Sequence, residues 1–349
     1  MPNLSVDIGK LHLENPVMAA SGTFGYAEEF ADFMDLKKLG AIVTKTITLN
    51  PRQGNLPPRT CETPAGMLNS IGLENPGIEV FVEEKLPALK KIGVPIIVSI
   101  ASEGGAAEFI ELVRRLDIIK EVSAIELNIS CPNIRLTGKP VSRLASERVS
   151  RLTSERVNGL KNLTGEPANR LTGTPEPAHR HTGKLISQDA QSTYEVVKAV
   201  RRVTKKTLIT KLSPNVTDIT QIALAAEEAG SDAVSLINTL MGMSIDIEKG
   251  RPRLAAVTGG LSGPAIRPVA IRMVWEVYQK IKVPIIGTGG IMDASSALEF
   301  FLAGATAINI GTANFVNPKA SIEIIEGIKK YLIQNKIKDI KALVGSLKT

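Results

Sequence analysis

The stretch VPIIGTGGIMDASSALEFFLAGATAINIG, residues 283–311, decides the fold of this chain. It predicts a short apolar strand (283–289), an amphipathic helix (294–304) and a second apolar strand (307–311), and each of the three ends in glycine. Apolar strands that alternate with helices are typical of a parallel sheet whose faces are covered by those helices. The stretch therefore predicts a strand–helix–strand unit with parallel strands.

The same alternation extends toward the N-terminus. Eight strands in alternation with helices predict an α/β fold, a (β/α)8 TIM barrel, preceded by a β-hairpin in LSVDIGKLHL (4–13). A doubly wound sheet is the alternative, but it leaves the eighth strand and the paired glycines beside it without a role. The other six strand-like runs are PVMAA (16–20), AIVTK (41–45), VPIIVSIA (94–101), AIELNIS (124–130), TLITKL (207–212) and DAVSLIN (232–238). Amphipathic helical patterns cover 28–40, 106–117, 193–203 and 219–230.

Residues 136–182 interrupt this pattern. SRLASERV (142–149) is repeated at once as SRLTSERV (150–157), and the segment holds eight Lys/Arg, four Glu and no aromatic residue. Such a composition buries too little apolar surface to offset the entropy of ordering the chain. We therefore expect one barrel domain built from 1–135 and 183–349, with 136–182 as a low-complexity, disordered insertion after the fourth strand. Most of the formal net charge of +7 lies in this insertion, so the basic balance is weak evidence for nucleic acid.

In a TIM barrel the chemistry lies at the C-terminal ends of the strands. This rule places Lys45, Asn128, Lys211, Asn238 and the cysteine of NISCPN (128–133) around one mouth. Since the histidines fall in the hairpin and the insertion, Cys131 is the candidate for acid–base chemistry there, with an inert buried cysteine as the alternative. The chain has two cysteines, too few for the four ligands of an iron–sulfur cluster.

Three glycine-rich loops follow late strands. GGLSGPAIRP (259–268), GTGGI (287–291) and INIGTANF (308–315) predict backbone sites for a phosphate. The first strand is not followed by GxGxxG, so a flavin mononucleotide fits better than NAD. Lys45 and Lys211 stand where a cation stabilises a reduced flavin or binds a substrate carboxylate; for either lysine, extension to solvent is the alternative.

With these residues assembled, the chain resembles the class 1 dihydroorotate dehydrogenases, most closely the NAD-linked heteromeric subclass, class 1B. The resemblance covers the chain outside the insertion. The segments that carry it are SGTFGYAEEF (21–30), TKTIT (44–48), LNSIGLENPG (68–77), NISCPN (128–133), KLSPN (211–215), INTLMGMSID (237–246), LSGPAIRP (261–268), GTGGI (287–291) and GTANF (311–315).

The resemblance implies the oxidation of (S)-dihydroorotate to orotate in pyrimidine biosynthesis. Cys131 would act as the general base that removes the C5 proton while a hydride passes from C6 to N5 of FMN. Substrate contacts would come from Lys45, Asn69, Ser70, Ile71, Gly72, Leu73, Asn128, Asn238 and Thr239. FMN contacts would come from Ser21, Lys45, Thr46, Ser99, Asn128, Lys211, Ile237, Gly263, Gly289, Gly290, Gly311 and Thr312.

The subclass also implies partners. Electrons would pass to a second subunit with FAD and an iron–sulfur cluster, and then to NAD, from a homodimeric core that forms a heterotetramer with that subunit. No metal or nucleic-acid partner is expected. No membrane partner is expected either, because no apolar run approaches the ~20 residues of a membrane helix. The N-terminus lacks the pattern of a signal peptide, so the expected location is the cytoplasm.

Two departures from the family pattern stand out. Ser99 occupies a position where the family usually has an asparagine near the flavin, and the insertion lies in the loop of the catalytic cysteine. The alternatives are an FMN barrel reductase of another pyrimidine, similar to tRNA-dihydrouridine synthases, and an inactive scaffold.

Overall fold

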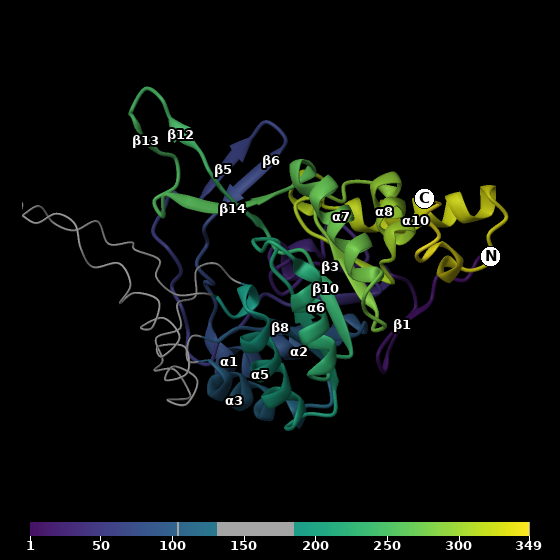
Figure 1. The fold of residues 1–349 in the computed structure, drawn as a ribbon, viewed down its shortest axis with the longest axis horizontal. Coiled ribbons are helices and arrows are strands. Elements are labelled where there is room, and N and C mark those ends of the chain that lie inside the picture. The colour runs from purple at the N-terminus through teal and green to yellow at the C-terminus, as the bar shows by residue number, and fades with distance from the viewer. Residues whose placement is uncertain (103–104, 131–184, 349) are drawn as a thin grey trace, which may run out of the picture. The chain divides into compact units, whose positions relative to one another are not determined.

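The computed structural model describes residues 1–102, 105–130 and 185–348. Eight parallel strands close into a barrel, and each pairs with the next in chain order until the last pairs with the first. The predicted TIM barrel and its eight strands are confirmed (Figure 1). The strands are β3 (Val17–Ala19), β4 (Ala41–Val43), β7 (Ile96–Ile100), β8 (Val122–Asn128), β9 (Thr207–Lys211), β10 (Ala233–Leu236), β15 (Ile285–Thr288) and β16 (Ala307–Ile310).

The strands are buried on both faces, which explains why their sequences are almost continuously apolar. Helices cover the outside and each contributes one apolar stripe. In α3 (Ala106–Asp117), for example, Phe109, Leu112, Val113 and Leu116 are buried while the opposite face is charged. The other covering helices are α1 (Gly77–Val80), which continues through a π-helical segment into α2 (Leu86–Ile92), α5 (Ala190–Arg201), α6 (Ile219–Glu228), α7 (Arg267–Tyr278), α8 (Ala294–Ala303), the short α9 (Ala313–Val316) and α10 (Ala320–Gln334).

The helix predicted over 28–40 is wrong. The structure has two single 3-10 turns there, Glu28–Phe30 and Leu36–Lys38. The Asp35 side chain accepts a hydrogen bond from the backbone N–H of Lys37 and so starts a new turn in the middle of the stretch. A local bond of this kind competes with the helical ladder.

The predicted N-terminal hairpin is confirmed as β1 (Val6–Ile8) and β2 (Leu11–Leu13). Its apolar residues are buried, and the backbone N–H of Lys10 donates to Thr207 Oγ1 at the start of β9. The hairpin therefore lies at the N-terminal end of the barrel, away from the strand ends at which barrel enzymes place their chemistry.

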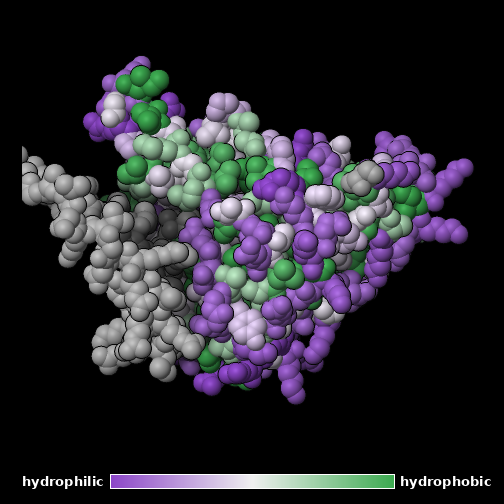
Figure 2. Space-filling view, viewed as in Figure 1, coloured by the Kyte–Doolittle hydropathy of each residue, from purple (hydrophilic) through white to green (hydrophobic). Residues whose placement is uncertain are grey.

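A second, antiparallel sheet borders the opposite end and was not predicted. Its order is β11 (Leu240–Met243), β14 (Thr258–Ser262), β6 (Gly66–Asn69) and β5 (Thr60–Thr63). Between β11 and β14 the chain makes the small hairpin of β12 (Ile245–Asp246) and β13 (Arg251–Pro252). Exposed apolar side chains gather over this region (Figure 2), among them those of Met241, Met243, Ile245, Ile247 and Val257. Within the described ranges, no helix is both long enough and apolar enough to cross a membrane.

Candidate active site

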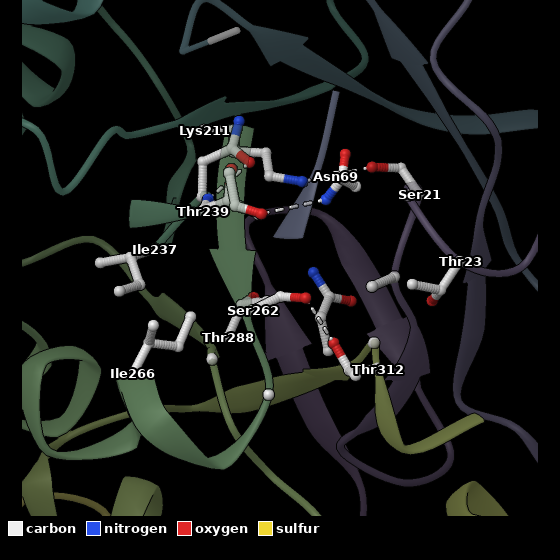
Figure 3. A pocket seen from close by; sticks show the side chains of 18 of the residues that line it. Ser21, Thr23, Asn69, Lys211, Ile237, Thr239, Ser262, Ile266, Thr288 and Thr312 are labelled. Carbon is white, nitrogen blue, oxygen red and sulfur yellow. Dashed lines mark hydrogen bonds between the residues drawn. The ribbon is translucent and has the colours of Figure 1, made fainter. Parts of the chain in front are cut away.

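A cavity opens at the C-terminal ends of the barrel strands, between the barrel and the antiparallel sheet. It contains about 1140 Å³ of empty space including its open mouth. Figure 3 shows the polar side chains of Ser21 and Thr23 on one side of the cavity and Ile237 and Ile266 on the other, with Lys211 above and between them.

Most of the predicted site residues meet in this cavity. The predicted residues that line it are Ser21, Lys45, Thr46, Asn69, Ile71, Gly72, Leu73, Asn128, Lys211, Ile237, Asn238, Thr239, Gly263, Gly289, Gly290, Gly311 and Thr312. Among the predicted residues that the structure describes, Ser70 and Ser99 are absent from the lining, and both are fully buried. Cys131 lies outside the described residues.

Asparagine side chains from separate elements hold one serine at the end of the described β8 segment. Ser130 Oγ donates to Asn128 Oδ1 at 3.0 Å and accepts from Asn238 Nδ2 at 2.8 Å. Asn128 Nδ2 in turn donates to Thr46 Oγ1 at 3.3 Å. Thr46, Asn128 and Ser130 are buried and Asn238 is half-buried, and buried polar groups of this kind fix a conformation when all are satisfied. The residue directly before position 131 is therefore held in place from both sides.

Lys211, the last residue of β9, reaches the cavity with its charge paired. Its Nζ donates to Ser21 Oγ at 3.2 Å and lies 3.8 Å from Oε1 of Glu126. The two side chains are only 9% and 1% exposed. Removal of one partner from a buried ion pair typically costs ~3–5 kcal/mol, because the other charge is left uncompensated. The alternative of a lysine that extends to solvent is thus wrong for Lys211.

Ser99 lies behind the cavity wall instead of on it. Its Oγ donates to Glu126 Oε1 at 3.0 Å and forms a hydrogen bond of 2.9 Å with Thr46 Oγ1. In the structure Ser99 therefore contacts residues of the cavity and does not face the space inside.

Glycines form the end of the cavity near β15 and β16. Gly263 and Gly290 have φ angles of 94° and 72°, in the region that side chains rarely adopt. A Cβ on Gly290 would lie 2.8 Å from the carbonyl oxygen of Gly263, and one on Gly263 would lie 2.8 Å from the Cα of Gly66. Three segments of backbone thus meet at contact distance, and only glycine allows this approach.

Three buried side-chain oxygens of the described cavity wall have no hydrogen-bond partner: Thr23 Oγ1, Thr288 Oγ1 and Asn309 Oδ1. Buried polar atoms are nearly always paired, so these oxygens are free to form hydrogen bonds with a polar molecule in the cavity. Together with the glycine loops they fit a cofactor that carries a phosphate and several hydroxyl groups, as FMN does. The residues present therefore fit the predicted cofactor.

The N-terminus of α8, directly after the glycine loop, is occupied by its own cap. The Asp293 carboxylate accepts from the backbone N–H of Ser296 at 2.8 Å and from its Oγ at 2.7 Å. These hydrogen bonds, the backbone one first, hold the pKa of Asp293 below its usual value. A phosphate at this end would therefore be bound by the loop backbone around Gly290 and Gly311 and not by the N-terminus of α8.

Sequence reasoning missed several residues of the site. Glu126 lies inside an apolar strand pattern, and its charge in a run buried on both faces was the available signal. Glu126 itself does not line the cavity; the lining residues that were missed are Ala20, Gly22, Thr23, Gly260, Ser262, Ile266, Thr288, Ile291, Met292 and Asn309. In the ranges that the structure describes, no cluster of His, Cys, Asp or Glu has the arrangement of a metal site.

Comparison with known proteins agrees with this geometry. The family model for dihydroorotate dehydrogenase matches residues 3–162 and 177–332. This chain belongs to the dihydroorotate dehydrogenase family. The internal gap of the match, 163–176, falls within the predicted insertion, whereas 136–162 and 177–182 of that insertion are matched.

Similar family members are named dihydroorotate dehydrogenase B (NAD(+)), catalytic subunit. The protein of that name from Geotalea uraniireducens is 48% identical over 348 residues, which cover 100% of this chain and 99% of that protein. The one from Bacteroides thetaiotaomicron is 47% identical over 350 residues, with 99% of each chain covered. The one from Thermoanaerobacter pseudethanolicus is 45% identical over 346 residues, again with 99% of each covered. The resemblance to class 1B predicted from the sequence is thereby confirmed.

Proposed function

We propose that this member of the dihydroorotate dehydrogenase family oxidises dihydroorotate to orotate in pyrimidine biosynthesis, with FMN as its bound cofactor. The observation that carries the proposal is one cavity with two chemically different walls. One wall is rich in amide side chains, from Asn69, Asn128 and Asn238, and the other is a close-packed glycine cradle.

The amide wall suits the ring of dihydroorotate. That ring is a cyclic diamide, with N–H donors and carbonyl acceptors that alternate around it, and an asparagine side chain offers both a donor and an acceptor. The ring also carries a carboxylate. Lys45 lines the same cavity and supplies a positive charge for it.

The glycine end suits the phosphate of FMN, which Gly263, Gly290 and Gly311 would hold through the backbone. Thr23, Thr288 and Asn309 would pair with the hydroxyl groups of the cofactor. Lys211 would lie beside the flavin ring, where a positive charge favours reduction. When bound, FMN supplies the acceptor for the electron pair that leaves with the hydrogen at C6 of the substrate.

The chain's own residues would remove the proton at C5. We assign this step to Cys131, a residue outside those described, because it directly follows Ser130. The hydrogen bonds of Ser130 to Asn128 and Asn238 hold this serine, the residue before Cys131, against two residues that line the cavity. A thiolate at this place is a stronger base than a serine hydroxyl.

We further infer that the electrons leave through a partner subunit. The similar proteins are named as catalytic subunits and as NAD(+) enzymes, which supports a second, electron-transferring subunit with FAD and an iron–sulfur cluster. We propose that two copies of this chain form a homodimeric core within such a heterotetramer, and that the complex is located in the cytoplasm.

The direct test is anaerobic mixing of the purified, flavin-loaded chain with dihydroorotate. Bleaching of the flavin absorbance, with one orotate formed for each flavin reduced, is the expected result. A flavin that stays oxidised with dihydroorotate, yet is bleached by dithionite, would contradict the proposal.

A further inference from the structure

Glu126 is a buried carboxylate that the proposed reaction does not yet use. Its hydrogen bond with Ser235 gives the direction of its side chain. Ser235 belongs to β10, which is separated from the β8 of Glu126 by the intervening strand β9. A contact across that strand is made through the barrel interior, so Glu126 points inward, below the cavity.

Both carboxylate oxygens of Glu126 are held. Oε1 accepts from Ser99 Oγ at 3.0 Å, and Oε2 accepts from Ser235 Oγ at 3.0 Å. Donors from two different strands thus fix the plane of the carboxylate. Lys211 lies between this anchor and the cavity, 3.8 Å from Oε1, and its Nζ donates onward to Ser21 Oγ at 3.2 Å.

We propose that Glu126 is a positioning residue that keeps Lys211 charged and directed at the cavity, and thereby sets how readily the bound flavin is reduced. The inference rests on the proposed function in that a flavin occupies the cavity. A buried ammonium without a counter-charge loses its proton more readily, whereas a carboxylate beside it favours the charged form. A cation beside a flavin stabilises the negative charge that reduction adds.

The groups that face Glu126 allow this role to be isolated. Ser99 from β7 and Ser235 from β10 present hydroxyls that do not titrate in the working range, and Lys211 from β9 presents the charge. Lys45 is the other lysine of the described cavity wall. It is left intact in every variant below, as is Cys131.

The test is a double-mutant cycle on the flavin-loaded chain, with Glu126→Gln, Lys211→Met and the double variant. The midpoint potential of the flavin is measured against reference dyes at several pH values. The reduced dye supplies the electron pair and solvent supplies the protons. In Glu126→Gln the potential should fall more steeply with pH than in the native chain, because a buried amine without its counter-charge favours uptake of an additional proton when reduction adds negative charge to the flavin. In the Lys211→Met background, Glu126→Gln should no longer make the slope steeper.

Two controls accompany the cycle. Glu228→Gln makes the same substitution on the exposed end of α6 and should leave the slope at the native value. Glu126→Asp retains the charge and should restore part of the native slope. An equal effect of Glu126→Gln in the presence and absence of Lys211 would overturn the proposal, since Glu126 would then act by another route.

Thermal unfolding of the flavin-free chains decides the case if Glu126→Gln binds flavin poorly. The loss of melting temperature caused by Glu126→Gln should be smaller in the Lys211→Met background, where no unpaired ammonium remains. Equal losses in both backgrounds would contradict the pairing. Neither measurement uses dihydroorotate, so a chain that binds flavin but does not oxidise dihydroorotate would refute the proposed function and leave this inference intact.

Discussion

Gly290→Ala tests whether the glycine loops hold the cofactor. Gly290 has a φ angle of 72°, and an alanine held there costs roughly 1–2 kcal/mol in backbone strain. The added Cβ would also lie 2.8 Å from the carbonyl oxygen of Gly263 and 3.0 Å from the backbone nitrogen of Arg267. These are backbone atoms, so the loop itself has to shift. We therefore expect FMN to bind at least about tenfold more weakly, which corresponds to ~1.4 kcal/mol.

Gly93→Ala is the matched control. Gly93 ends α2 with a φ angle of 83°, and a Cβ there meets no atom within 4 Å. Gly93→Ala therefore introduces the same kind of backbone strain as Gly290→Ala. It does so without crowding and far from the cavity loops. Titration of the flavin-free chains with FMN, followed by flavin fluorescence, gives the two dissociation constants. Equal constants for the two variants, with equal losses of unfolding free energy, would refute the assignment of the cradle to FMN.

The remaining predictions concern single groups and the insertion. Thr288→Val should weaken FMN binding about fivefold, for a lost hydrogen bond of ~1 kcal/mol, without lowering the stability of the flavin-free chain; a less stable flavin-free chain would mean that Thr288 Oγ1 already has a partner. Asp293→Asn should lower the unfolding free energy by ~0.5–1 kcal/mol at neutral pH. Because the folded-state pKa of Asp293 is depressed, this difference should vanish as the pH falls through the folded-state value, and a constant difference would count against it. Cys131→Ser should retain FMN and slow flavin reduction by dihydroorotate at neutral pH in stopped-flow measurements; an unchanged rate would remove Cys131 from its role. Deletion of 136–182 should give a folded, flavin-loaded chain, and an insoluble product would show that the segment is structural.

The barrel could be predicted because the apolar pattern of each strand can be recognised within a few neighbouring residues. A strand buried on both faces needs an apolar residue at nearly every position, and β7 and β15 satisfy this in sequence as well as in structure. Because Lys211 and Asn128 lie at the ends of predicted strands, they could be assigned to the mouth of the barrel without further information. The same locality explains the error at 28–40, where the apolar spacing was helical but Asp35 bonds its own neighbouring backbone.

The antiparallel sheet could not be predicted from local patterns. The β5 sequence TCET alternates between half-buried and exposed positions, and β14 carries two successive glycines, neither of which indicates a strand. Its central pairing joins Asn69 to Gly260, residues far apart in the chain, so its register depends on the barrel that brings them together. The contacts of Glu126 were hidden for the same reason, since its partners come from three other strands.

The two walls of the cavity differ in how they respond to substitution. Around Gly263 and Gly290 the contact is made by main chain against main chain, and an added carbon atom at either position forces the loops apart. At the opposite wall, contacts with a ligand would come from the side chains of Asn69, Asn128 and Asn238, and the last two also hold Ser130 in place. Divergence toward another heterocycle is therefore most open at Asn69, and a laboratory search for new substrates should randomise Asn69 while Asn128, Asn238 and the nucleotide-holding glycine wall stay fixed.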